Sequence, residues 1–329
     1  MRRTSALVSS VAVVTVLSAA LVGCAASPDD VTGCEPLVAG GDASVLVEAT
    51  GEVGSAPEVS IPAPLVADAA ERTVLERGEG LVARVGMTVD FDAAVYDGRT
   101  GDLLIKSAFN GTQGVRYRAG LPISSTQDEA SSLARALVCA QPGERIALAT
   151  PADDTGIDLS GAGVTGDSTV VVVLDVQEVF LGKADGVNQL PQDGLPVVVT
   201  APDGTVGVTV PSGIEAPTEN RTAVIKLGSG PKLAAEDLAV LQIANWVWPT
   251  GDDAEIDEKT STWDQGKMPE TVALTASGDQ AIPSVFLDAL IGLPVGSQVL
   301  VVVAPTAEST NASIFVFDVL GIQSAPGTR

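Results

Sequence analysis

The side chains of this sequence offer few routes to covalent catalysis. Histidine is absent, and cysteine occurs three times, at Cys24, Cys34 and Cys139. A zinc site built with histidine, a Ser-His-Asp triad and a Cys–His dyad are therefore excluded by composition. The sequence also has no G-x-x-x-x-G-K-[ST] phosphate loop, and no dinucleotide fingerprint follows a strand. We predict that the protein uses no metal, no cofactor and no catalytic nucleophile.

Carboxylates are the most abundant charged groups. The chain has 42 Asp and Glu residues against 18 Lys and Arg, for a net charge of −24, which makes nucleic acid a poor partner. Gly251–Glu258 crowds its carboxylates as a calcium-binding loop does, but it lacks the D-x-[DN]-x-[DN]-G order of such loops. We interpret this segment, like Asp153-Asp154, as a solvated loop.

Cys24 ends a segment that is typical of a bacterial lipoprotein signal. A basic start at Met1-Arg2-Arg3 precedes an apolar run from Ala6 to Val22, as in secretory signals. Leu21-Val22-Gly23-Cys24 resembles a lipobox, whose cysteine is lipidated and becomes the new N-terminus. We predict a signal peptide over 1–23, a tether over 24–33 and a location on the outer face of the cell membrane. The alternative is an uncleaved membrane anchor, for which the apolar run is short.

Cys34 and Cys139 are the two thiols that remain once Cys24 is lipidated. Secretion places both in an oxidising setting, so we predict that they form a disulfide. The alternative is two unpaired thiols, with Cys139 serving as a small buried apolar residue.

Two stretches of the chain share one pattern of helix, turn and strand. In Ile282–Pro305, apolar residues at helical spacing predict a short helix, a Pro and Gly turn ends it, and Val299–Val303 predicts a buried strand. Asp128–Pro151 repeats this pattern. The two apolar stripes are Phe286, Ala289, Leu290 and Leu293, and Leu133, Ala136, Leu137 and Ala140. A spacing of roughly 150 residues exceeds that of solenoid repeats and predicts two homologous domains.

We therefore predict domain 1 over residues 34–186, a polar linker over 187–196, domain 2 over 197–322 and a loose tail over 323–329. In domain 1 the lead-in strands Ala43–Ala49 and Glu58–Ile61 are flanked by prolines, which favours a place at the sheet edge. Many antiparallel strands with one short helix predict an α+β fold, in which a curved sheet wraps on the helix of each domain.

Further motifs lie before, within and after the helix, turn and strand, in a fixed order. In the second domain they are Trp246-Val247-Trp248-x-Thr250-Gly251, Ser261-Thr262-Trp263-Asp264-Gln265-Gly266, Leu290-x-Gly292-x-x-Val295-Gly296-Ser297 and Phe315-Val316-Phe317-Asp318-Val319. The first domain keeps Ala136-Leu137, Pro142-Gly143-Glu144-Arg145 and Leu174-Asp175-Val176. By their order and duplication, these motifs resemble the FKBP-type peptidyl-prolyl isomerases, specifically tandem secreted lipoproteins of Gram-positive actinobacteria.

The resemblance implies catalysis without a nucleophile, which suits a chain that has no histidine. Rotation about an X–Pro bond is slow because the partial double bond sets a barrier of roughly 18–20 kcal/mol. An apolar pocket can favour the twisted amide, which has lost resonance, over the planar amide that water solvates well.

The resemblance also implies where each pocket lies. The family's pocket positions fall on Phe91, Ile105, Leu133 and Leu174 in domain 1, and on Ile243, Phe286 and Phe317 in domain 2. Trp246 and Trp263 are candidate additions to the second pocket, although packing is their favoured role. The family's Phe-Asp pair falls on Ile105-Lys106 and on Lys259-Thr260, so the carboxylate is lost in both domains. The tyrosine that precedes the last strand has no counterpart.

Three interpretations stay open at this point. The first is a tethered prolyl isomerase that acts on proline-containing segments of secreted or surface proteins, mainly through domain 2. The second is a chaperone or binding module that keeps the fold without turnover, as the lost Asp and Tyr positions favour. The third is a structural lipoprotein whose domains bind a fixed partner.

Overall fold

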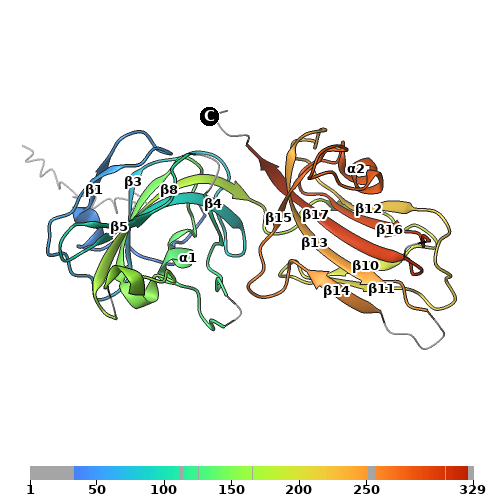
Figure 1. The fold of residues 1–329 in the computed structure, drawn as a ribbon, viewed down its shortest axis with the longest axis horizontal. Coiled ribbons are helices and arrows are strands. Elements are labelled where there is room, and N and C mark those ends of the chain that lie inside the picture. Colours follow the sequence, from blue (N-terminus) through green and yellow to red (C-terminus); the bar gives the residue numbers. More distant parts are fainter. Residues whose placement is uncertain are drawn as a thin grey trace, which may run out of the picture.

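Two antiparallel sheets, one in each half of the chain, form the framework of the molecule (Figure 1). The computed structural model describes residues 33–110, 114–124, 126–164, 166–250, 256–307 and 309–324. The predicted signal peptide, Cys24 and all but the last residue of the predicted tether lie outside these ranges, as do 251–255 of the acidic loop and 325–329 of the tail. Within the described ranges, no helix is long and apolar enough to span a membrane.

The sheet of domain 1 has the order β3-β7-β8-β4-β5, and β6 also pairs with β4. All of these pairings are antiparallel. The strands are β3 (Glu71–Glu76), β4 (Thr88–Asp97), β5 (Leu103–Lys106), β6 (Val115–Arg118), β7 (Arg145–Pro151) and β8 (Thr169–Phe180). The helix α1 (Ser132–Ala136) lies between β6 and β7 in the chain.

The sheet of domain 2 has the order β14-β13-β17-β16-β12-β9, with β15 also paired to β13. Its strands are β9 (Val187–Asn188), β12 (Arg221–Leu227), β13 (Leu238–Val247), β14 (Asp257–Ser261), β15 (Glu270–Ala273), β16 (Gln298–Val303) and β17 (Ser313–Gln323). The helix α2 (Ser284–Leu290) precedes β16. Apart from β9, this order is that of domain 1 read from the other end, as a duplicated domain produces.

Each domain also begins with a separate two-stranded hairpin. In domain 1 a 3-10 turn, η1 (Ser44–Leu46), leads into β1 (Glu48–Thr50) and β2 (Glu58–Ser60), and in domain 2 the hairpin is β10 (Val197–Thr200) with β11 (Val206–Thr209). The prolines led us to expect these strands at the edge of the main sheet. Instead, β1 and β2 pair with each other in a separate hairpin. Two further 3-10 turns, η2 (Ala152–Asp154) and η3 (Ser160–Ala162), lie in the loop before β8.

The predicted α+β layout, with each sheet wrapped on its helix, is wrong. The molecule is mostly β, with four sheets and two α-helices of five and seven residues among the described parts of the chain. The physical reason is that each main sheet is covered on both faces. In β8, Val170, Val172 and Leu174 belong to the core on the helix side, whereas Val171 and Val173 belong to the core under the hairpin.

This two-sided covering explains the unbroken aliphatic runs in the sequence. Successive side chains of a strand point to opposite faces, so a strand that alternates apolar and polar residues leaves one face solvated. β8 instead buries all but one of its 12 residues. In domain 2, Val206 and Val208 of the hairpin cover one face of the sheet, and Leu287 and Leu290 of α2 cover the other.

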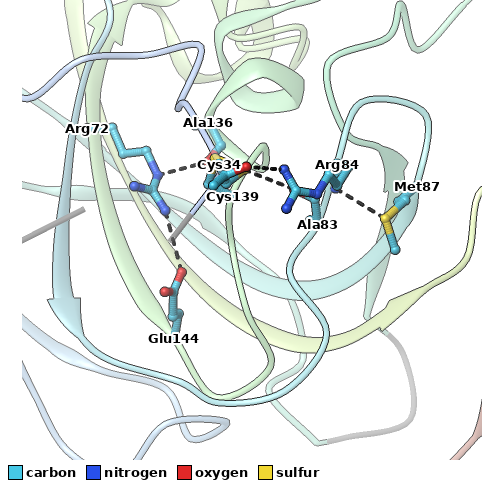
Figure 2. Close-up of a disulfide and its surroundings, with 9 residues drawn as sticks. Cys34, Arg72, Ala83, Arg84, Met87, Ala136, Cys139 and Glu144 are labelled. Atoms are coloured by element: carbon cyan, nitrogen blue, oxygen red, sulfur yellow. Dashed lines mark hydrogen bonds and ion pairs between the residues drawn. A yellow bond between two sulfur atoms is a disulfide. The ribbon is translucent and has the colours of Figure 1, made fainter. Parts of the chain in front are cut away.

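A disulfide joins Cys34 to Cys139, with an S–S distance of 2.06 Å and a Cα–Cα distance of 5.7 Å (Figure 2). The bond ties the start of domain 1 to the turn that follows α1. Beside it, the buried Arg72 donates from Nε to the carbonyl oxygen of Ala136 at 2.9 Å and forms an ion pair with Glu144 at 3.4 Å. This side of domain 1 is therefore held by covalent and ionic links.

The connection between the domains is short and anchored. The amide of Ala184 donates to Asp318 Oδ2 at 2.7 Å, and the amide of Gly186 donates to the Gly296 carbonyl at 2.9 Å. The predicted linker 187–196 starts as β9, which pairs with β12. Val187 and Asn188 thus add a short edge strand to the sheet of domain 2.

Candidate functional site

Aromatic side chains gather on the helix side of domain 2. Ring centroids lie 4.9 Å apart for Phe286 and Phe315, 5.3 Å for Phe286 and Phe317, and 6.1 Å for Phe315 and Phe317. Phe317 is buried, while Phe286, Phe315 and the neighbouring Ile243 are only partly buried. These four residues are called the aromatic cluster below.

Three elements position the aromatic cluster. Phe315 and Phe317 are two residues apart on β17 and therefore share one face of the sheet. Ile243 of the neighbouring strand β13 is paired directly with Phe317. Phe286 stands on α2, which follows Pro283 and ends at Leu290. Edge-to-face ring contacts at these distances stabilise such a group beyond simple area burial.

Sequence analysis placed Ile243, Phe286 and Phe317 in the second pocket, and the structure brings these three together. Sequence analysis did not include Phe315 in the pocket, although Phe315 lies two residues before Phe317 and therefore on the same face of the strand. The two tryptophans lie elsewhere. Trp246 and Trp263 belong to the core on the hairpin side, with Trp248 and the hairpin residue Val208. Trp246 is three residues from Ile243, an odd number, so its side chain points to the opposite face of β13.

The corresponding place in domain 1 is filled. Phe91, Leu133 and Leu174 are 0%, 1% and 0% exposed, so these side chains leave no open surface there. Tyr117 packs edge-on against Phe91 with a centroid distance of 5.4 Å, and burial raises the pKa of its phenol. Tyr117 is a second aromatic that sequence analysis missed.

Ile105 does not join this group. Its side chain is 51% exposed, whereas its neighbour Leu104 packs against the helix-side core. The pairing of β4 with β5 is irregular between Val95 and Tyr96, so the face that each β5 residue takes could not be counted from sequence.

The aromatic cluster offers apolar contact and no acid–base group. Its four members carry no titratable side chain, and Lys106, which the sequence resemblance placed at a carboxylate position, is exposed. In the described part of the chain, no group of three or more His, Cys, Asp or Glu side chains is placed to hold a metal ion. The chemistry open to the cluster is therefore desolvation of an apolar or aromatic ligand group.

Comparison with solved structures finds FKBP-type peptidyl-prolyl isomerases. Three FKBP domains of wheat FKBP73 are 13% identical over 77% of this chain and 94% of that chain, with a TM-score of 0.31. The N-terminal domain of FKBP42 from Arabidopsis thaliana is 14% identical over 39% of this chain and 98% of that chain, with a TM-score of 0.29. A peptidyl-prolyl cis-trans isomerase from Pseudomonas syringae pv. tomato is 19% identical over 35% of this chain and 80% of that chain, with a TM-score of 0.26.

TM-scores this low assign neither a fold nor an activity to the chain. No protein-family model matches the sequence, and no curated protein matches it.

Proposed function

We propose that this protein is an FKBP-type peptidyl-prolyl cis-trans isomerase whose working site is the aromatic cluster of domain 2. The observation that carries the proposal is the partly open group of Phe286, Phe315 and Phe317 between α2 and the sheet. An apolar aromatic surface can bind a proline ring and remove water from the preceding amide. Because the twisted amide depends less on solvation by water than the planar one, that environment lowers the barrier to rotation.

Domain 1 takes a supporting role in this proposal. Its corresponding residues Phe91, Leu133 and Leu174 are closed to solvent, so a proline side chain has no place to enter. We infer that domain 1 stabilises and positions domain 2.

The test replaces Phe286 and Phe317 with leucine, the residue that domain 1 has at the corresponding positions Leu133 and Leu174. Phe286→Leu and Phe317→Leu change shape with modest loss of volume, so the fold should tolerate them. We expect each to lower kcat/KM for a proline tetrapeptide about tenfold, which corresponds to a loss of ~1.4 kcal/mol of transition-state stabilisation. Leu133→Met in domain 1 is the matched control and should leave kcat/KM unchanged. Equal rates in parent and both Leu variants would contradict the proposal.

A second candidate function is peptide binding without turnover. The specific observation that favours it is the chemistry around the aromatic cluster, whose members carry no carboxylate or phenol. This function predicts that the parent protein binds a proline peptide, that Phe286→Leu weakens the binding, and that isomerisation proceeds at the uncatalysed rate.

We propose further that the protein acts on secreted or surface proteins from a lipid anchor at Cys24. The support is the lipobox-like Leu21-Val22-Gly23-Cys24 after a basic and apolar start. Membrane fractionation of the parent and of Cys24→Ser tests the anchor. The parent should sediment with membranes and the variant should be released, and a variant that stays as membrane-bound as the parent would exclude lipid anchoring.

A further inference from the structure

A cleft of about 1030 Å³ lies between the two domains. Each domain contributes corresponding parts. Domain 1 supplies the turn at Pro142-Gly143 and the end of β8, and domain 2 supplies Val295 and the end of β17. The aromatic cluster takes no part in its lining, so the cleft is a separate place on the molecule. Its volume suits a bound ligand, and ligand sites are frequent at domain interfaces.

The end of β8 gives the cleft an open strand edge. On one side β8 pairs with β4 as far as Phe180, but on the other its pairing with β7 stops at Asp175. One more pair of bonds, between Val176 and the turn before β7, closes that side. Every residue from Val176 to Leu181 lines the cleft. Because successive side chains point to opposite faces, a cleft lined by consecutive residues runs along the edge of the strand.

The end of β17 gives the cleft a second edge of the same kind. β17 pairs with β13 as far as Gln323, whereas its pairing with β16 stops at Asp318. The residues Leu320–Ile322 line the cleft. The two edges meet where the amide of Leu181 donates to the carbonyl of Leu320 at 3.2 Å, and the cleft opens from that point.

Alternation along the strands shows which main-chain groups face the cleft. The amide of Leu181, the residue after β8, donates toward β17, and the amide of Ser324, the residue after β17, donates to Glu178 Oε1 at 2.9 Å. Main-chain groups of residues two apart in an antiparallel strand point to the same side. Val179 and Ile322 therefore direct their N–H and C=O groups into the cleft, where the described part of the chain provides no partner strand.

The charge of the cleft indicates what would enter it. Its described lining includes the carboxylates of Glu52, Glu178 and Asp185 and no lysine or arginine. Between them lie apolar side chains such as Leu81 and Val295. A ligand with positive charges between apolar groups complements this lining.

We propose that this cleft binds an extended polypeptide segment that alternates basic and apolar residues, and that the segment adds as a strand to the open edges of β8 and β17. Unpaired strand edges bind other chains in this way, with main-chain hydrogen bonds supplying affinity and side-chain pockets supplying selectivity. The site requires no proline and works independently of the aromatic cluster.

The test uses the full chain and a capped peptide of alternating lysine and valine, seven residues long, titrated by calorimetry. We expect saturable one-to-one binding. A peptide with the same side chains, N-methylated at alternate residues on one edge, loses main-chain donors on that edge. Two such peptides are compared, one methylated along each edge. The peptide whose methylated edge faces β8 or β17 should bind about tenfold more weakly or worse. An alternating glutamate and valine peptide should not bind. Equal affinity for all methylated and unmethylated peptides would reduce the interaction to charge attraction and overturn the proposal.

Two protein variants locate the site. Val179→Pro and Ile322→Pro each remove an N–H that points out of the sheet. Proline is tolerated at strand positions whose N–H makes no hydrogen bond within the sheet. Each should weaken binding of the lysine–valine peptide about tenfold, whereas Phe286→Leu should leave it unchanged. Unaltered binding by both proline variants, or loss with Phe286→Leu, would contradict the site. If a proline variant unfolds, the N-methylated peptides still decide the question on the parent chain.

Discussion

At the scale of single residues, one buried carboxylate occupies the same place in both domains and has different partners. Asp175 forms an ion pair with Arg145 at 2.6 Å and accepts from the amide of Gly54 at 2.7 Å. Arg145 also donates to the carbonyls of Gly51 and Glu52. The pair therefore holds the loop of the β1–β2 hairpin against the main sheet.

In domain 2 the arginine is replaced by Gln298. Asp318 accepts from Gln298 Nε2 and from the amide of Ala184, each at 2.7 Å. Without an ion-pair partner in contact, burial raises the pKa of Asp318. The same acid position thus fixes the hairpin in one domain and the connection between domains in the other.

We predict different effects for the same substitution at these two positions. Asp175→Asn leaves the buried guanidinium of Arg145 without its carboxylate and should lower the free energy of unfolding by ~3–5 kcal/mol. Asp318→Asn keeps an acceptor for Ala184 and removes a buried charge, so stability at neutral pH should be equal or higher. Urea unfolding at pH 7 compares the two.

The pH dependence gives this prediction a second readout. Because the pKa of folded Asp318 lies above that of the unfolded chain, its protonated form favours folding. That contribution is full below the ordinary pKa of about 3.9 and is lost as the pH rises through the raised value. Asp318→Asn should flatten the decline of domain 2 stability over that window. A decline as steep as in the parent would contradict the assignment.

At the scale of elements, the hairpins that cover the outer faces of the sheets stabilise the domains without forming the candidate site. Trp246 is 3% exposed and packs in the core with Val206 and Val208 of β11. We predict that Trp246→Ala lowers the free energy of unfolding of domain 2 by ~3–5 kcal/mol. At a temperature where the variant is folded, its proline isomerisation rate should match that of the parent. A lost rate with intact folding would place Trp246 in the site after all.

The disulfide is a second device at this scale. It joins residues 105 apart in the chain, and the chain-entropy model gives such a closure up to ~4–5 kcal/mol. We predict that Cys139→Ser lowers the unfolding free energy of domain 1 by about 2–4 kcal/mol and leaves domain 2 unaffected. Urea unfolding of parent and variant measures this. The same midpoint for both proteins would show that the bridge does not stabilise domain 1.

These elements also show which parts of the fold can be predicted from the sequence. The helices, the duplicated order and the buried strands β8 and β17 could be predicted because apolar spacing depends on local geometry alone. The positions of the hairpins could not be predicted. A segment flanked by prolines has the sequence of an edge strand, both when it joins the main sheet and when it lies over the face of that sheet. Ile105 was misplaced for a related reason, since an irregular pairing changes which face each later residue takes. Ile243 and Trp246 lie on β13, whose pairing with β17 is regular between them, so their odd spacing could have separated the two faces.

At the scale of the whole molecule, side chains of domain 1 also form hydrogen bonds with domain 2, in addition to the segment that connects the two domains. Arg116 of β6 forms an ion pair with Asp90 at 2.6 Å and donates to Thr271 Oγ1 of domain 2 at 2.9 Å. Arg118 donates to the carbonyl of Thr262 at 2.6 Å. These contacts link β6 of domain 1 to β15 and to the loop before it in domain 2.

A tight contact between the domains lies at Gly321. A Cβ added there would come within 2.4 Å of Cδ1 of Phe180, a buried ring that packs with Val240 and Leu320. The ring cannot move aside without losing these contacts, so we predict that Gly321→Ala lowers the free energy of unfolding by ~1–3 kcal/mol and loosens the two domains. Gly161→Ala is the control, because a Cβ at Gly161 meets no atom within 4 Å. Proteolysis of the connection near residues 181–186 should accelerate in Gly321→Ala alone, and equal cleavage of the two variants would show that the domains are not held by this contact.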